Sequence, residues 1–274
     1  MKLSGLALSA CLIFAGSTVA QAPVPASGPA PTGERLDQLL TAWEKRMAGT
    51  ESLYTKTSRT ETHPLTKKQT TFVGEAAFQK PSMARIDLTH QDEVGKPDAE
   101  KTNFERLFCT GQYIYEYSPA DKKIIIHEMP KNNPADDNMI MSFLKGMKAA
   151  NAKARFDMTL SKEDEWYGYL LISPKNAADK AEFTAAQLTI WMKNPNPANK
   201  PDLAMMPVRL WYRQPNGKEV TYTFGDMQPN VNLPKDAFVP RQIAGYKVEN
   251  AQPAVPMSPL VPKTPAPIVR EQKP

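Results

Sequence analysis

The sequence predicts a mainly β fold of the α+β class, in which about ten or eleven antiparallel strands curl around an apolar interior. Two observations predict the strands: many short segments alternate apolar and polar residues with a period of two, and turn residues separate these segments. A third observation predicts two helices, because two segments place apolar residues at helical spacing. Short turns join antiparallel strands, and a sheet with this many strands must curl or close.

The expected strands follow the alternation along the chain. Phe72, Gly74, Ala76 and Phe78 lie on one face of a strand, and Gly168 occurs in a later one. Because glycine in a strand often marks a bend or a close approach, we expect these small residues to leave room for an apolar chamber. The segments are 52–61, 72–78, 84–88, 104–109, 113–117, 124–129, 154–160, 165–172, 183–192, 207–213 and 219–224, with a short edge strand near 233–240.

One helix is expected before the first strand and a second in the middle of the chain. The N-terminal helix carries an apolar stripe and ends at Gly49; the stripe is Leu36, Leu39, Leu40, Trp43 and Met47. Asn138 is expected to cap the mid-chain helix, which would cover the chamber as a lid. The apolar residues of this lid are Ile140, Phe143, Leu144 and Met147.

The chain divides into four parts by composition. Residues 1–20 have a short positive start, an apolar run and small residues before a cleavage point, which predicts a signal peptide. Residues 21–33 are a proline-rich linker, 34–248 one domain, and 249–274 a proline-rich disordered tail. Lipid anchoring through Cys11 is an alternative to an ordinary leader, and a tether or partner-binding segment is an alternative for the tail.

Composition and motifs favour a binding protein over an enzyme. The net charge of +5 is spread along the chain, which does not favour a nucleic-acid interface. His63, His90 and His127 are too scattered to predict a metal site, and no nucleophile, zinc or phosphate-binding motif occurs. We therefore expect no catalytic residues, metal or cofactor. No second long apolar run follows the leader, so no stable membrane insertion is expected.

The order of several motifs resembles one known family. Residues 74–86 read G-x-A-x-F-x-K-P-x-x-x-R-I, residues 111–119 read G-Q-x-I-Y-E-Y-x-P, and residues 169–175 read Y-x-L-x-x-P-K. Together with the preceding helix, these motifs resemble the outer-membrane lipoprotein carriers (LolA/LolB-like proteins), and a planctomycete-type branch of that superfamily is the most similar. The resemblance covers residues 34–248. It implies an unclosed β-barrel with helices as a lid, a periplasmic location, and shielding of the acyl chains of a lipoprotein or lipid.

One position departs from the family pattern. The proteobacterial carriers have an arginine before the turn proline that bonds to the lid, whereas this chain has Lys80, which lacks the planar fork of arginine. A strict carrier cycle between membrane-bound donor and acceptor proteins is therefore less favoured than a lipid cavity. An envelope sensor or protein-interaction module on the same fold is the alternative.

The candidate ligand-binding residues are the apolar side chains expected to line the chamber and its lid, and Lys80 takes the lid-latch position. They are Trp43, Phe72, Phe78, Ile86, Leu88, Tyr115, Ile140, Phe143, Leu144, Met147 and Trp191.

Overall fold

The computed structural model describes residues 33–129, 148–198 and 200–251, and its main feature is one sheet of twelve strands. The strand order is β12-β6-β5-β4-β3-β2-β1-β11-β10-β9-β8-β7, so β12 and β7 are the two edges, neither pairs with a further strand of the described residues, and the sheet is not closed. The strands are β1 (Ser52–Thr62), β2 (Gln69–Gln79), β3 (Met83–His90), β4 (Phe104–Thr110), β5 (Tyr113–Ser118), β6 (Lys123–Glu128), β7 (Phe156–Glu163), β8 (Tyr167–Pro174), β9 (Ala185–Trp191), β10 (Pro207–Arg213), β11 (Glu219–Pro229) and β12 (Lys247–Asn250).

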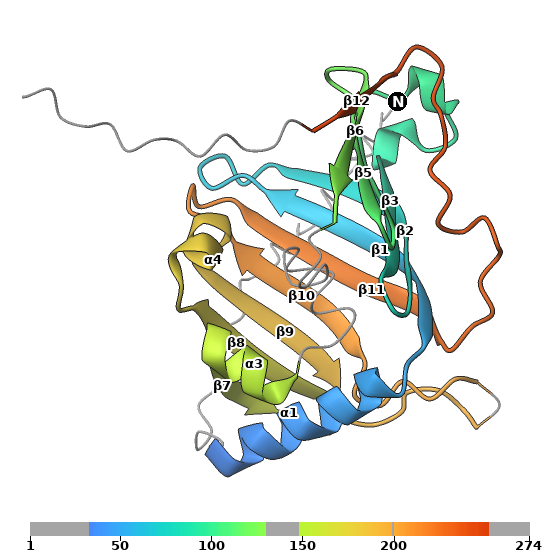
Figure 1. Cartoon of the computed structure of the whole chain (residues 1–274). Coiled ribbons are helices and arrows are strands. Elements are labelled where there is room, and N and C mark those ends of the chain that lie inside the picture. The colour runs from blue at the N-terminus through green and yellow to red at the C-terminus, as the bar shows by residue number, and fades with distance from the viewer. Residues whose placement is uncertain (1–32, 130–147, 199, 252–274) are drawn as a thin grey trace, which may run out of the picture.

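Three α-helices accompany the sheet in the described part of the chain: α1 (Gly33–Ala48), α3 (Ala149–Arg155) and α4 (Ala177–Glu182). Helix α1 lies across one end of the curled sheet (Figure 1). The turns of the β1–β2 and β10–β11 hairpins lie at the other end of β1, where a side chain on Gly217 would meet Pro64 at 3.2 Å. The expected fold class, an unclosed and mainly β sheet with an N-terminal helix, is confirmed.

The differences from the expected elements lie before β7, between β8 and β9, and after β11. Residues 154 and 155 belong to α3 rather than to a strand, and α4 was not expected. Residues 233–240 form no strand; the last strand is β12, which runs parallel to β6 and continues past Val248 to Asn250. The expected lid helix, with Ile140, Phe143, Leu144 and Met147, lies outside the described residues, as do the leader and most of the tail.

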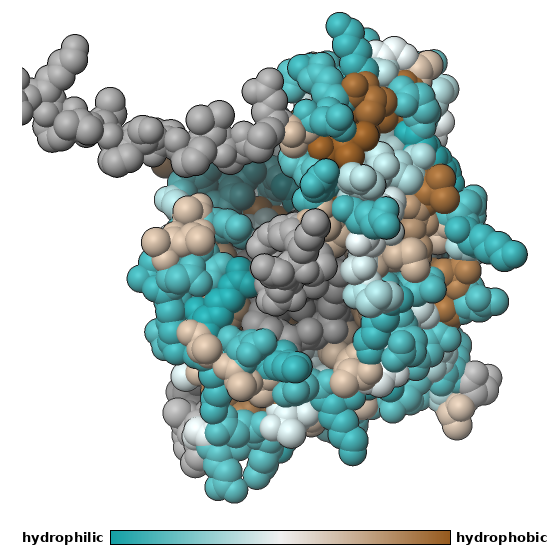
Figure 2. Space-filling view, in the orientation of Figure 1, coloured by the Kyte–Doolittle hydropathy of each residue, from teal (hydrophilic) through white to brown (hydrophobic). Residues whose placement is uncertain are grey.

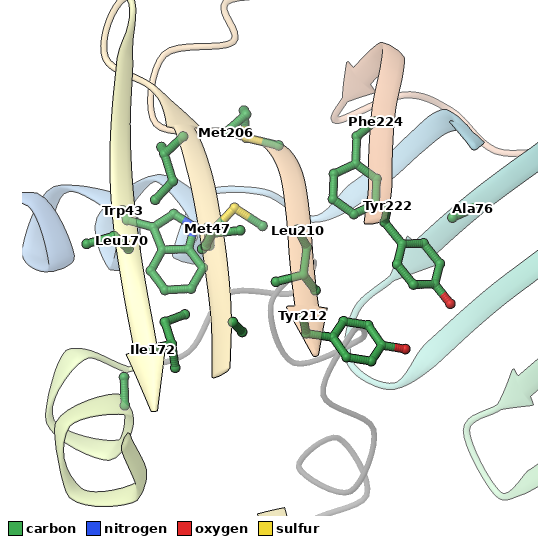
Figure 3. Packing of buried hydrophobic residues seen from close by; sticks show 14 of the residues in the cluster. Trp43, Met47, Ala76, Leu170, Ile172, Met206, Leu210, Tyr212, Tyr222 and Phe224 are labelled. Atoms are coloured by element: carbon green, nitrogen blue, oxygen red, sulfur yellow. The ribbon is translucent and has the colours of Figure 1, made fainter. Parts of the chain in front are cut away.

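The apolar face of the sheet is built by alternation. Leu53 of β1 pairs with Phe78 of β2, which pairs with Ala84 of β3, and all three side chains are buried on one face. We call this the inner face, because the apolar stripe of α1 packs against it. Figure 3 shows Trp43 and Met47 among side chains from β8, β10 and β11 on this face. Residues at the intervening positions belong to the outer face.

The outer face is partly covered by the C-terminal segment of the domain. Ile243 and Tyr246 pack on a mainly aromatic apolar cluster from β4, β5 and β6, which consists of Phe104, Phe108, Tyr117 and the aliphatic Ile124. The hydroxyl of Tyr117 donates a hydrogen bond to the carbonyl oxygen of Arg241 at 2.7 Å. In Figure 2 most of the visible surface is hydrophilic, with an apolar patch in the region of β6 and β12.

Candidate functional site

Four of the predicted ligand-binding residues meet on the inner face. Phe78, Ile86 and Leu88 project from β2 and β3, where Ala76 pairs with Ile86 and Gly74 with Leu88. Trp43 reaches the same apolar cluster from α1 and is fully buried. This grouping follows from the period of two in the strands and of 3.6 in the helix, which direct these side chains to one interior.

Phe72 lies farther along β2, toward the end of the sheet that is opposite α1. It is half-buried against the apolar cluster and makes an edge-to-face contact with the ring of His90, with 5.5 Å between the centroids. The guanidinium carbon of Arg59 lies 5.3 Å from its ring centroid. Phe72 therefore marks the boundary between the apolar inner face and a polar region.

Tyr115 and Trp191 do not lie with the others, which corrects the expected site. Cys109 pairs with Ile114 on the inner face, so Tyr115, which pairs with Phe108, points to the outer face. Likewise Ile190 lies on the inner face, and Trp191 stacks on Tyr167 with 4.6 Å between ring centroids. Adjacent residues in a strand point to opposite faces, so the ring of Tyr115 cannot line the same interior as Phe78. Trp191, at the end of β9, is half-buried and packs against the edge of the apolar cluster without lining its centre.

The glycines that were expected to leave room are closely packed. A side chain on Gly74 would overlap the carbonyl oxygen of Asp87 and lie 3.1 Å from the Cα atom of Leu88. A side chain on Gly168 would meet the sulfur of Met192 at 2.8 Å and a methyl carbon of Leu39 at 3.4 Å. Gly74 thus permits a close approach of β2 and β3, and Gly168 permits the packing of α1; neither opens the interior.

Lys80 contacts the end of α1. Its ammonium group donates to the carbonyl oxygen of Ala48, the last residue of the helix, and lies 3.2 Å from Oε1 of Glu51. A positive charge at a helix C-terminus interacts favourably with the helix dipole. Lys80 therefore fixes the connection between α1 and β1 through the contacts of one ammonium group with Ala48 and Glu51.

A polar cluster on the inner face was missed by the sequence reasoning. Nη1 of Arg59 lies 3.0 Å from Oε2 of Glu105, and Nζ of Lys218 lies 3.2 Å from Oε2 of Glu61. Arg59 also pairs with Glu61 through its second terminal nitrogen. Arg59 and Glu61 follow Leu53 at even spacing along β1, which was the available signal that charged side chains point inward. We call these four residues the inner charge cluster.

Burial and charge shift the pKa values around this cluster. Burial raises the pKa of Glu105, and the nearby charge of Arg59 only partly offsets it. Burial also raises the pKa of Tyr212 to about 12 and that of Tyr222 well above its ordinary value. Both tyrosines therefore keep their protons at neutral pH, and the hydroxyl of Tyr222 is hydrogen-bonded to Glu105. Figure 3 shows their hydroxyl groups pointing to the same side of β10 and β11.

None of three cavities found among the described residues is lined by the predicted apolar residues. A cavity of about 180 Å³ lies beside the inner charge cluster and is lined by Glu61, His63, Thr66, Lys68, Thr70 and Lys218. Cavities of about 540 Å³ and 620 Å³ lie elsewhere, one beside Met83 and Phe238 and the other beside Tyr54 and Met227. The first is the only one of these three that adjoins the polar end of the inner face.

No group of three or more His, Cys, Asp or Glu residues within the described ranges is arranged to hold a metal ion. None of the helices in those ranges has the length and apolarity needed to cross a membrane.

Comparisons with known proteins are limited to solved structures, because no family model and no curated protein matches the sequence. An uncharacterized conserved protein from Thermus thermophilus aligns over 77% of this chain and 98% of its own, with 11% identity and a TM-score of 0.42. A LolA superfamily protein from Nitrosomonas europaea aligns over 74% and 97%, with 10% identity and a TM-score of 0.38.

The lipoprotein LppX from Mycobacterium tuberculosis aligns over 74% of this chain and 100% of its own, with 11% identity and a TM-score of 0.35. At these TM-scores the likenesses assign neither a ligand nor an activity to the chain. The assignment to a planctomycete-type branch stays a prediction.

Proposed function

We propose that this protein is exported to the periplasm and shelters an acyl chain of a lipid or lipoprotein against the inner face of its sheet. The observation that carries this proposal is the continuous apolar surface of the inner face. It runs from Cys109 on β4, through Ile86 and Phe78, to Leu210 and Leu170 on the other half of the sheet. Because the described sheet ends at β7 and β12 and is not closed, no closed ladder of hydrogen bonds has to break for it to widen around a ligand.

The energetics suit a protein that both takes up and releases its ligand. Each methylene that leaves water contributes about 0.8 kcal/mol, so a chain of about sixteen carbons gains at most about 12 kcal/mol relative to water. The same chain gains little or nothing relative to a bilayer, which is equally apolar. Transfer to and from a membrane-bound donor or acceptor protein therefore needs no large input of energy.

The lining of the inner face is adaptable. Met47, Met206 and Met227 are buried in the apolar cluster beside aromatic side chains. Methionine is unbranched and polarizable, so it adjusts to ligands of different shape at low cost. Small residues such as Ala76 and Ala84 alternate with Phe78 and Ile86 on the same face.

The test is titration of the purified protein with a fluorescent monoacylglycerol, comparing wild type with Ala76→Leu. The added carbons project from the inner face, so they compete with the acyl chain, and we expect about a tenfold loss of affinity. The matched control is Ala185→Leu, the same change on the outer face of β9, where affinity should not change. Absence of binding by the wild type, or equal effects of the two variants, would refute the proposal. A specific protein partner without lipid uptake would instead favour the sensor alternative.

A further inference from the structure

We infer that the inner charge cluster is the headgroup end of the site and that it selects lipids whose head carries no net charge. This inference rests on the proposed function, because it adds a preference for the head to a site for the chain. The inner face thus has an apolar end, where Trp43 and Phe78 lie, and a polar end beyond Phe72.

The geometry at the polar end is built around Arg59. Its guanidinium carbon lies 5.3 Å from the ring centroid of Phe72 and 5.9 Å from that of Tyr222, so an aromatic ring lies near it on both neighbouring strands. Its terminal nitrogens pair with Glu61 and Glu105. Glu105 comes from β4 while Arg59 comes from β1, so the pair crosses the interior above β2 and β3. The cluster therefore lies at the polar end of the inner face, where the head of a chain bound along the apolar end would lie.

The charges of the cluster balance. Two cations, Arg59 and Lys218, face two carboxylates, Glu61 and Glu105, and each charge has an opposite partner. An anionic head that binds Arg59 would have to displace a carboxylate and leave it in a largely buried place, which is strongly unfavourable. A head without net charge leaves all the pairs intact. Lys68, on the rim of the neighbouring cavity, is exposed, so solvent and salt screen its charge.

The cluster also offers unused hydrogen-bonding capacity. Nε of Arg59 is buried and has no hydrogen-bond partner among the described residues. A buried donor without a partner is costly, so an acceptor from a ligand gains more here than at the surface. A hydroxyl or ester oxygen can serve as this acceptor without bringing a charge. Selection then comes from both attraction of a neutral head and exclusion of a charged one.

The test uses three lipids with one oleoyl chain each and different heads: monooleoylglycerol, oleoyl lysophosphatidylcholine and oleoyl lysophosphatidic acid. Each competes with a fluorescent monoacylglycerol, whose head is uncharged, for the mature protein at neutral pH, below the critical micelle concentration. We expect the uncharged and zwitterionic lipids to bind at least about tenfold more tightly than the anionic one. Equal or tighter binding of the anionic lipid would overturn the inference and leave the proposed function intact. Absence of binding by all three would refute the proposed function and the inference with it.

A pair of variants separates the cluster from the net charge of the protein. Glu105→Gln leaves the cluster with one excess positive charge, and the preference should shift toward lysophosphatidic acid by about tenfold. Glu75→Gln is the matched control, because Glu75 also pairs with an arginine, Arg85, but lies on the outer face. The side chain of Glu75 is 36% exposed and that of Glu105 is 35% exposed. An unchanged preference in Glu105→Gln, or the same shift in Glu75→Gln, would overturn the inference.

Discussion

Replacement of Gly74 by alanine tests the close approach of β2 and β3 that curls the sheet. A β-carbon at this position would overlap the carbonyl oxygen of Asp87 and lie 3.0 Å from its carbonyl carbon and 3.1 Å from Cα of Leu88. Ordinary carbon contacts are about 3.5–4.0 Å, so the backbone of β3 must move by about half an ångström or more. These atoms belong to the backbone of a paired strand, and no flexible side chain can absorb the movement.

We expect Gly74→Ala to lower the free energy of unfolding by about 1–3 kcal/mol, the usual cost of overpacking. For a domain of this size this corresponds to a fall in Tm of about 2–12 °C, measured by circular dichroism. The control is Gly225→Ala on β11, where the nearest atom to a β-carbon is the carbonyl oxygen of Lys56 at 3.9 Å. That change should be neutral or slightly stabilising. An unchanged Tm in Gly74→Ala, or equal losses in both variants, would refute the reasoning.

Three further predictions concern the elements around the inner face. Trp43→Ala should cost roughly 3–5 kcal/mol of stability in urea unfolding, because the indole is fully buried, and a loss below about 1 kcal/mol would contradict its place in the core. Lys80→Met should cost about 0.5–1.5 kcal/mol by removing the hydrogen bond to Ala48, whereas Lys80→Arg should be nearly neutral in the same assay. Glu93 accepts hydrogen bonds from Asn103 and Thr102, which lower its pKa from 4.5 to about 2. The ionised Glu93 stabilises the fold above about pH 4.5, and this contribution is lost as pH falls toward 2. The difference in Tm between wild type and Glu93→Gln should therefore vanish near pH 2. A difference that stays constant with pH would contradict this prediction.

The elements with a strong local period could be predicted from the sequence. The stripe from Leu36 to Met47 and the alternation around Phe78 and Ile86 fix both the type of element and the buried face. These signals depend only on neighbouring residues, because a side chain that points inward repeats at a fixed spacing along one element.

The face of a strand was harder to predict where both faces are apolar. Tyr113, Ile114 and Tyr115 are all apolar or aromatic, so alternation does not show which of them points inward. The register with β4 decides the question, since Ile114 pairs with Cys109, and register is a property of two strands rather than of one. For Trp191, the alternation of Leu188 and Ile190 indicated the inner face of β9, and Trp191 follows them at the end of the strand.

Features that join distant segments could not be predicted from local patterns. The pair between Arg59 and Glu105 connects β1 to β4 across two intervening strands, and β12 pairs with β6 only after the chain has completed the rest of the sheet. Both depend on how far the sheet curls. No residue near Arg59 or Lys247 in the sequence specifies the partner on the other element.

The most direct test of the central claim is native mass spectrometry of the full-length protein purified under mild conditions from the envelope of its own cells. We predict a population that carries one acylated molecule, whose mass is lost on organic extraction and whose occupancy falls in Ala76→Leu but not in Ala185→Leu. Protein that is reproducibly free of lipid, and that shows no rise in Tm with an excess of a monoacylglycerol, would contradict the claim that the inner face binds acyl chains.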